Sequence, residues 1–175
     1  TVGFLGIGAL GMYCAHATAK QGFNVVGWSR SLKSDDVVKC YTGDDRLRDV
    51  LAQSNILVLL MPDTPETENM INADTITQMK DGAAIINPGR GPLIDDAALL
   101  AGLDSGKLSG ATLDVFRVEP LPANDPYWTH PKVLVTPHIA SETRLETSAA
   151  VVVKNIKLGE MGLPFLHLVD REAGY

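Results

Sequence analysis

Long apolar runs, excess positive charge and cysteine are all scarce in this sequence, and each scarcity excludes a class of protein. No apolar run in the 175 residues approaches the length that crosses a bilayer, and no charged segment leads into an apolar one as in a signal peptide. Fifteen lysine and arginine residues against 21 aspartate and glutamate residues give a net charge of −6. That balance argues against a general surface for nucleic acid or an anionic membrane. We therefore expect a cytoplasmic protein that binds neither.

The spacing of the two cysteines argues against a metal-binding or redox motif. Cys14 and Cys40 have neither CxxC spacing nor a neighbouring histidine at the spacing of a metal site. We expect buried thiols in a reducing compartment and no bound metal.

Short apolar runs alternate with helical patterns along the chain, whose length suits one domain or slightly more. Strands are expected at 2–7, 24–28, 37–41, 55–61, 83–87, 111–116 and 133–136. Helices are expected at 10–21, 44–53, 74–80, 95–105 and 142–159, with N-caps at Asp44, Asp74 and Asp95 and helix-ending glycines at Gly22 and Gly106. Most strands are apolar on both faces. This alternation predicts an α/β fold of Rossmann type, a doubly wound parallel sheet covered by helices on both sides.

The unusual residues of the sequence follow the ends of the expected strands. Ligands of such a sheet bind outside the carboxyl ends of its strands. The stretches after those ends are GIGALG at 6–11, Ser29-Arg30, Pro62-Asp63-Thr64-Pro65, Pro88-Gly89-Arg90-Gly91, Asp114 with Glu119, and Pro137-His138. Almost every residue capable of chemistry is therefore expected at one edge of the sheet.

The GxGxxG pattern is weak evidence alone, but here a strand precedes it and a helix follows. Gly6 would permit the tight turn, Gly8 would let a pyrophosphate approach the backbone, and Gly11 would let the helix pack closely. The helix N-terminus, at Ala9 and Leu10, would supply N–H donors and a partial positive charge. A merely structural turn is the alternative.

Arg30 lies beside the position where a dinucleotide-binding unit of this kind often carries an aspartate for the ribose hydroxyls. Ser29 is neutral, so it would not repel a 2′-phosphate, and the Arg30 guanidinium would bind one with paired N–H groups. Lys33 would add a second charge and Ser31 a hydroxyl. This pattern favours NADP(H) over NAD(H); a solvated basic loop is the alternative.

From residue 85 onward the chain closely resembles the D-isomer-specific 2-hydroxyacid dehydrogenases. The resemblance rests on INPGRGPLIDDAALLAGLDSGKLSGATLDVFRVEPLP and VLVTPHIA, and GWSRS and the final VDREAGY extend it to members that prefer NADPH. Pro88 is a small departure, because many relatives carry a small or aliphatic residue there.

The resemblance implies an NADPH-dependent reductase of small 2-oxo acids such as glyoxylate and hydroxypyruvate. It implies Arg90, Glu119 and His138 as catalytic residues: His138 as proton donor, Glu119 orienting its ring, and Arg90 binding the substrate carboxylate. Asp114 is implied near the nicotinamide. The expected cofactor-binding residues are Gly6, Gly8, Ala9, Leu10, Gly11, Ser29, Arg30, Ser31, Lys33, Met61, Pro62, Pro88, Gly89, Arg90, Asp114 and His138.

The resemblance also implies an incomplete enzyme. Residues 1–140 would form the dinucleotide-binding domain, and residues 141–175 a helix and tail that return to a substrate domain whose N-terminal part is missing. The complete protein would be a homodimer. Two alternatives stay open: a dinucleotide-sensing interaction protein of the corepressor kind, and a fragment that binds cofactor and catalyses nothing.

Overall fold

The computed structural model describes residues 1–171, so residues 172–175 of the expected tail lie outside the described part. The chain divides into two compact units, Thr1–His138 and Ile139–Tyr175. Within residues 1–171, no helix combines the length and apolar character that a membrane span requires.

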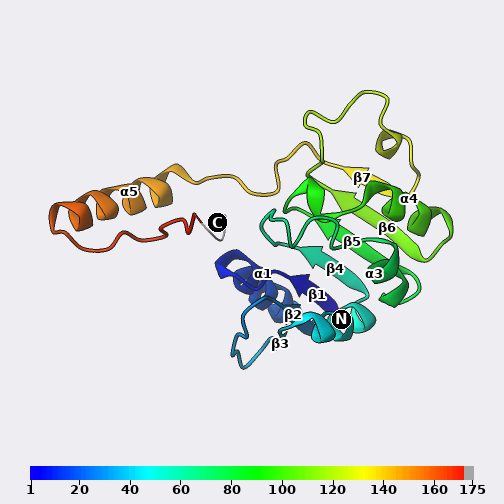
Figure 1. The fold of residues 1–175 in the computed structure, drawn as a ribbon, viewed down its shortest axis with the longest axis horizontal. Coiled ribbons are helices and arrows are strands. Elements are labelled where there is room, and N and C mark those ends of the chain that lie inside the picture. Colours follow the sequence, from blue (N-terminus) through cyan, green and yellow to red (C-terminus); the bar gives the residue numbers. More distant parts are fainter. Residues whose placement is uncertain (172–175) are drawn as a thin grey trace. The chain divides into compact units, whose positions relative to one another are not determined.

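The first unit is built on a seven-stranded parallel sheet in the order β3-β2-β1-β4-β5-β6-β7 (Figure 1). Its strands are β1 (Val2–Leu5), β2 (Val25–Trp28), β3 (Lys39–Tyr41), β4 (Ile56–Leu59), β5 (Ala83–Asn87), β6 (Leu108–Leu113) and β7 (Val133–Val135). The order runs outward in both directions from β1, which confirms the doubly wound parallel sheet of Rossmann type. Strand β6 begins three residues earlier than expected, because a register shift between Ala83 and Ala84 admits Leu108 to the ladder.

All five expected helices are present; α2 has the expected bounds, and the other four differ from expectation at their ends. They are α1 (Ala9–Lys20), α2 (Asp44–Gln53), α3 (Ala73–Gln78), α4 (Asp96–Asp104) and, in the second unit, α5 (Leu145–Glu160). Gly22 and Gly106 follow α1 and α4 with φ of 90° and 80°, the left-handed conformation expected of helix-ending glycines.

The expected N-caps are confirmed at one helix and wrong at two. The Asp95 side chain accepts a hydrogen bond from the Ala98 N–H at 3.1 Å, as a cap of α4 should. Helix α2 begins after Gly43, which leaves Asp44 inside the first turn. Helix α3 is capped by Asn72, whose side chain accepts from the Thr75 N–H while the Thr75 hydroxyl accepts from the Asn72 N–H. Acidic residues are common both at caps and in first turns, so the pattern did not separate these positions.

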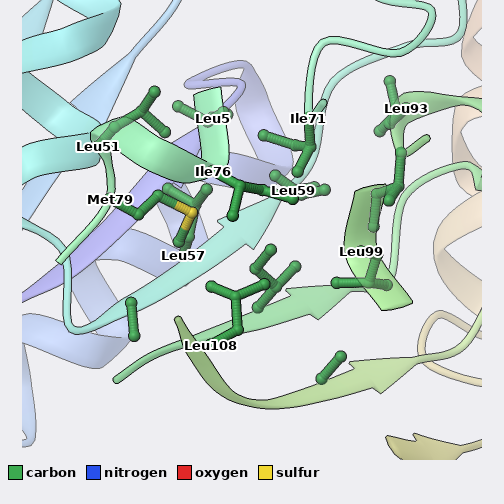
Figure 2. Close-up of a cluster of buried hydrophobic side chains, with 14 of the residues drawn as sticks. Leu5, Leu51, Leu57, Leu59, Ile71, Ile76, Met79, Leu93, Leu99 and Leu108 are labelled. Atoms are coloured by element: carbon green, nitrogen blue, oxygen red, sulfur yellow. The ribbon is translucent and has the colours of Figure 1, made fainter. Parts of the chain in front are cut away.

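The larger core lies between one face of the sheet and helices α2, α3 and α4. Figure 2 shows leucines of the central strands packed against side chains of these helices and of the loops beside them. The fully buried side chains include Leu5, Leu51, Leu57, Leu59, Ile71, Leu93, Leu99 and Leu108. Each buried leucine or isoleucine contributes roughly 1.5–3 kcal/mol relative to an exposed one. This face therefore holds the strands in the arrangement that aligns their carboxyl ends.

Helix α1 packs on the opposite face of the sheet. Ala15 is buried there with Phe4, Val25 and Val58, and the two cysteines lie half-buried against the same cluster. Burial raises the pKa of both thiols. Beyond α1, the first unit leaves a shallow apolar hollow over the later strands, lined in part by Ile56, Ala84, Ile86, Thr112 and Leu134. Within this unit, helices therefore cover only part of that face.

The second unit contains residues 139–144, then α5 and the segment that follows it. No residue of α5 is buried. The Asn155 side chain donates to the Leu166 carbonyl and accepts from the Leu166 N–H, which ties the following segment back to the helix.

The cap of α3 can be tested by two neighbouring substitutions. Asn72→Ala should lower the free energy of unfolding by about 1 kcal/mol, because it removes one side of the reciprocal cap. Asp74→Ala, in the first turn, should cost less. Urea unfolding of both variants measures this, and equal losses would contradict the capping role of Asn72.

Candidate cofactor and catalytic site

The glycine-rich turn between β1 and α1 is crowded at two glycines and open at the third. Gly6 has φ of 100°, and a Cβ there would lie 2.5 Å from the Leu60 carbonyl. A Cβ at Gly11 would lie 1.8 Å from the Gly6 oxygen. At Gly8, the N-cap residue of α1, a Cβ would meet no described atom within 4 Å outside its own neighbourhood in the chain. The turn therefore fits an anion that approaches the backbone at Gly8.

The start of α1 is suited to bind that anion. Gly8, Ala9 and Leu10 are exposed, and the first turn carries neither an acidic residue nor a side-chain cap. The N–H groups and partial positive charge of the helix end are thus directed to solvent without a competing carboxylate of the first turn.

The loop after β2 presents the cationic residues that the sequence singled out. Ser29 uses its hydroxyl to bond the Ser31 carbonyl at 2.7 Å, and the Thr42 hydroxyl donates to the Arg30 carbonyl at 2.7 Å. Arg30, Ser31 and Lys33 are exposed. The backbone at Arg30 is therefore held while the charged side chains face solvent.

The ends of β4 and β5 provide mostly backbone and apolar surface. Met61 is buried, and the Pro62 carbonyl accepts from the Thr67 hydroxyl at 2.7 Å. Pro88 is half-buried, and a Cβ at Gly89 would lie 2.8 Å from the Leu59 carbonyl oxygen. The two strand ends thus pack closely at the backbone.

Asn87 organises the loop that carries Arg90, and the sequence analysis did not single it out. It is 1% exposed; its Oδ1 accepts from the Gly89 N–H at 3.1 Å and its Nδ2 donates to the Arg90 carbonyl at 2.9 Å. The feature of the sequence that could have marked Asn87 is its carboxamide at the end of an otherwise apolar strand.

Asp114 is buried where β6 ends, at 3% exposure. Its carboxylate accepts from the Thr136 hydroxyl at 2.5 Å, and its carbonyl accepts from the His138 N–H at 2.8 Å. Its own N–H donates to the Asn87 carbonyl at 3.0 Å. Asp114 thereby links the ends of β5, β6 and β7.

His138 and Glu119 are joined by a side-chain hydrogen bond at this edge. The Nδ1 atom of His138 lies 2.7 Å from Oε2 of Glu119, and Oε1 accepts from the Phe116 N–H at 2.9 Å. The Phe116 amide, the His138 ring and the charge of Arg90 lower the pKa of Glu119. His138 has φ of 54°, an uncommon conformation that histidine tolerates better than most residues. Glu119 thus binds the Nδ1 side of the ring, and this contact does not involve Nε2.

Arg117 is a second organising residue that sequence reasoning missed. Its guanidinium donates to Glu68 at 3.1 Å, to the Asn69 side chain at 2.5 Å and to the Ile94 carbonyl at 2.9 Å. It therefore ties the segment that carries Glu119 to the loops after β4 and β5. No local pattern marked it, since its partners lie more than 20 residues away in the sequence.

The other three histidines lie outside this set of residues. His130 lies in a loop and contacts Asp104, and His167 belongs to the second unit. His16 is on α1, and its Nε2 lies 2.7 Å from Asp35 Oδ2. That contact joins α1 to the loop after β2.

The doubly wound parallel sheet, with an open glycine turn and a helix N-terminus at its carboxyl edge, has the fold of a Rossmann-type dinucleotide-binding domain. A sequence model described as "D-isomer specific 2-hydroxyacid dehydrogenase, NAD binding domain" matches residues 1–140. The chain belongs to this family.

Three relatives give the likeness in detail. Glyoxylate/hydroxypyruvate reductase A of Salmonella heidelberg is 44% identical over all 175 residues, which cover 56% of that protein. A dehydrogenase structure from Xanthobacter autotrophicus, in complex with NADPH and MES, is 47% identical with a TM-score of 0.96, over 99% of this chain and 72% of that one. The NADPH-dependent glyoxylate/hydroxypyruvate reductase of Sinorhizobium meliloti, in complex with NADP and sulfate, is 39% identical with a TM-score of 0.95, over 99% and 56%. The chain thus spans little more than half the length of the curated relative.

Because the pKa of Glu119 is lowered in the fold, its contribution to stability should depend on pH. A carboxyl whose folded pKa is depressed stabilises the fold above its unfolded pKa, near 4.3, and loses that contribution as pH falls through the folded value. Glu119→Gln should therefore reduce the free energy of unfolding at pH 7 by less than about 1 kcal/mol, given the exposure of the pair. The difference from the parent should disappear in strong acid.

Urea unfolding between pH 2 and 7 measures this difference. Asp63→Asn, which alters an exposed carboxylate on a neighbouring loop, is the control and should show no comparable pH-dependent loss. A Glu119→Gln difference that stays constant across the range would contradict the electrostatic account.

Proposed function

We propose that this chain is the NADPH-binding part of a reductase that converts small 2-oxo acids, such as glyoxylate or hydroxypyruvate, to 2-hydroxy acids. The observation that carries the proposal is the 2.7 Å contact between His138 and Glu119 at the sheet edge that also carries Arg90 and the glycine turn. The relatives named as glyoxylate/hydroxypyruvate reductases support the substrate class.

Cofactor binding is assigned to two phosphate-binding regions. The backbone at Gly8, Ala9 and Leu10, next to the close contact of Gly6 and Gly11, receives the pyrophosphate. Arg30 binds the 2′-phosphate with paired N–H groups, assisted by Ser29, Ser31 and Lys33. The open space at Gly8 and the exposure of the Arg30 loop support this assignment, as do the relatives solved with NADPH or NADP.

The remaining cofactor-binding residues surround the nicotinamide end of the proposed site. Met61, Pro62, Pro88 and Gly89 supply apolar and backbone surface from the ends of β4 and β5. The assignment of Asp114 to the nicotinamide carboxamide stands on the family resemblance and on its place at the end of β6. The bound NADPH supplies the hydride that reduces the substrate carbonyl carbon.

The protein's own residues would manage the proton and the substrate carboxylate. His138 donates a proton to the carbonyl oxygen as the carbon receives the hydride, so that the oxo group becomes a hydroxyl. Glu119 holds the ring through Nδ1, which directs Nε2 toward the substrate. Arg90 binds the carboxylate and polarises the carbonyl with its paired N–H groups.

The same proposal gives the two parts of the chain different roles. Residues 1–140 would bind the cofactor, and residues 141–175 would complete a substrate domain supplied by further sequence. The 56% coverage of the curated relative supports this. The expectations of a homodimer and of a cytoplasmic location remain predictions.

The choice of cofactor is tested by comparing Arg30→Ala with Gly8→Ala. Loss of the Arg30 guanidinium should weaken NADPH binding by about 10- to 100-fold, the effect of one charged hydrogen-bonding group, and leave NADH binding nearly unchanged. A methyl group at Gly8 should weaken both cofactors alike, because both carry the pyrophosphate. Calorimetric titration gives the four constants. An unchanged NADPH/NADH ratio in Arg30→Ala would exclude it as the discriminator.

Cofactor binding should need only this chain, whereas catalysis should need the longer protein. The chain alone should bind NADPH yet show little glyoxylate-dependent NADPH oxidation, because a productive site needs a second wall to hold the carbonyl and exclude water. In the longer two-domain protein, His138→Ala should lower kcat by roughly two to four orders of magnitude. Arg90→Ala should mainly raise KM. Both binding and NADPH oxidation are measured on the same samples.

Three outcomes would overturn this account or part of it. Turnover by the chain alone equal to that of the longer protein would show that the second wall is dispensable. Near-normal kcat in the His138 variant would remove its role as proton donor. A longer protein that binds NADPH without turnover but retains a protein partner would favour the dinucleotide-sensing alternative.

A further inference from the structure

The loop between β2 and β3 carries the proposed phosphate-binding side chains, but its middle is exposed. Ser31, Leu32, Lys33 and Ser34 all face solvent. Before them, the Thr42 hydroxyl bonds the Arg30 carbonyl at 2.7 Å. A flexible loop must lose conformational entropy when its side chains engage a ligand, so a second tether after residue 34 would lower the cost of binding.

Asp35 provides that tether within the loop itself. Its Oδ1 atom accepts from the Val37 N–H at 2.9 Å and from the Val38 N–H at 2.8 Å. These bonds close a tight turn just before Val38, which is 1% exposed in the cluster beneath α1. The bonds from the two amides and from His16 lower the pKa of the Asp35 carboxyl. The carboxylate therefore stays ionised and fully engaged at neutral pH.

His16 connects this turn to the helix at whose N-terminus the pyrophosphate is proposed to bind. Its Nε2 lies 2.7 Å from Asp35 Oδ2, and the two side chains are 38% and 16% exposed. His16 is on α1, the helix that follows the glycine turn. The pair therefore links the element that is proposed to bind the pyrophosphate to the loop that is proposed to bind the 2′-phosphate.

We propose that His16 and Asp35 are positioning residues for NADPH: their contact holds the Arg30–Lys33 segment at a set spacing from the N-terminus of α1. Neither side chain needs to touch the cofactor. The inference rests on the proposed NADPH binding and adds to it a determinant that lies outside the phosphate-binding residues themselves. Because NADH lacks the 2′-phosphate, the contact should matter for NADPH alone.

The position of the charges favours positioning over direct attraction. Asp35 would oppose a nearby phosphate if its carboxylate were unpaired, but its oxygens are occupied by two amides and an imidazole. Both carboxylate oxygens are thus directed at hydrogen-bond donors of the loop and of α1.

The test compares NADPH and NADH binding to the whole chain carrying His16→Ala, His16→Gln or Lys20→Ala. His16→Ala should weaken NADPH binding by about three- to tenfold, as expected for one lost ordering contact, and change NADH binding by less than about twofold. Glutamine can place its Nε2 donor where the imidazole Nε2 was, so His16→Gln should restore most of the NADPH affinity. Lys20→Ala, an exposed change on the same helix, should alter neither constant.

A double-mutant cycle adds a second, independent measurement. Asp35→Ala should lose at least as much NADPH affinity as His16→Ala, and the double variant should lose no more than Asp35→Ala alone, because both remove one contact. NADH binding reports that each variant is folded. If His16→Ala does not fold, the His16→Gln and Asp35→Ala comparison decides the question by the same ratio.

Three results would overturn the inference. The first is an unchanged NADPH/NADH ratio in both His16→Ala and Asp35→Ala. The second is an equal loss in His16→Ala and His16→Gln, which would mean that the charge of the imidazole matters and not its hydrogen bond. The third is strictly additive losses in the double variant. Failure of the parent chain to bind NADPH would instead refute the proposed function.

Discussion

The parallel hydrogen bonding of the seven strands is the constraint on which the rest of the molecule depends. Strand β1 pairs in the same direction with β2 and with β4, and the pairing continues outward to β3 and β7. All strands therefore end at one edge. Residues as distant in sequence as Gly6 and His138 reach that edge because the sheet, not local sequence, sets their direction. The buried leucines of β1 and β4 and of helices α2 to α4 stabilise this arrangement.

At that edge, backbone and buried polar groups align the loops from one strand to the next. The Asp114 N–H bonds the Asn87 carbonyl, and the Asp114 carbonyl accepts from the His138 N–H. Asn87 holds the loop of Arg90, and Arg117 holds the segment of Glu119. Each of these polar groups is satisfied, so the loops are placed by bonds that are costly to leave unmade. This explains how the segments that follow β5, β6 and β7 are held together at one edge of the sheet.

Much of the fold was predictable because its signals are local. Apolar runs on both faces predicted the strands, and periodicity predicted all five helices. Glycine positions were predictable for a steric reason: a Cβ at Gly11 would lie 1.8 Å from the Gly6 oxygen. The N-caps were less predictable. Asp44 and Asp74 are residue types that often cap helices, but they lie one and two residues after the actual N-caps, Gly43 and Asn72. Periodicity locates a helix but does not set its first residue.

The sequence by itself determined the class of fold, the glycine turn and the residues that follow each strand, because these depend on steric and apolar patterns within a few positions. Only the tertiary structure decided which of those residues meet. The 2.7 Å contacts of His138 with Glu119 and of His16 with Asp35 each join positions 19 residues apart. Arg117 likewise binds side chains and backbone of two other loops. Such contacts depend on how loops leave the sheet, and no periodicity in the sequence encodes that geometry.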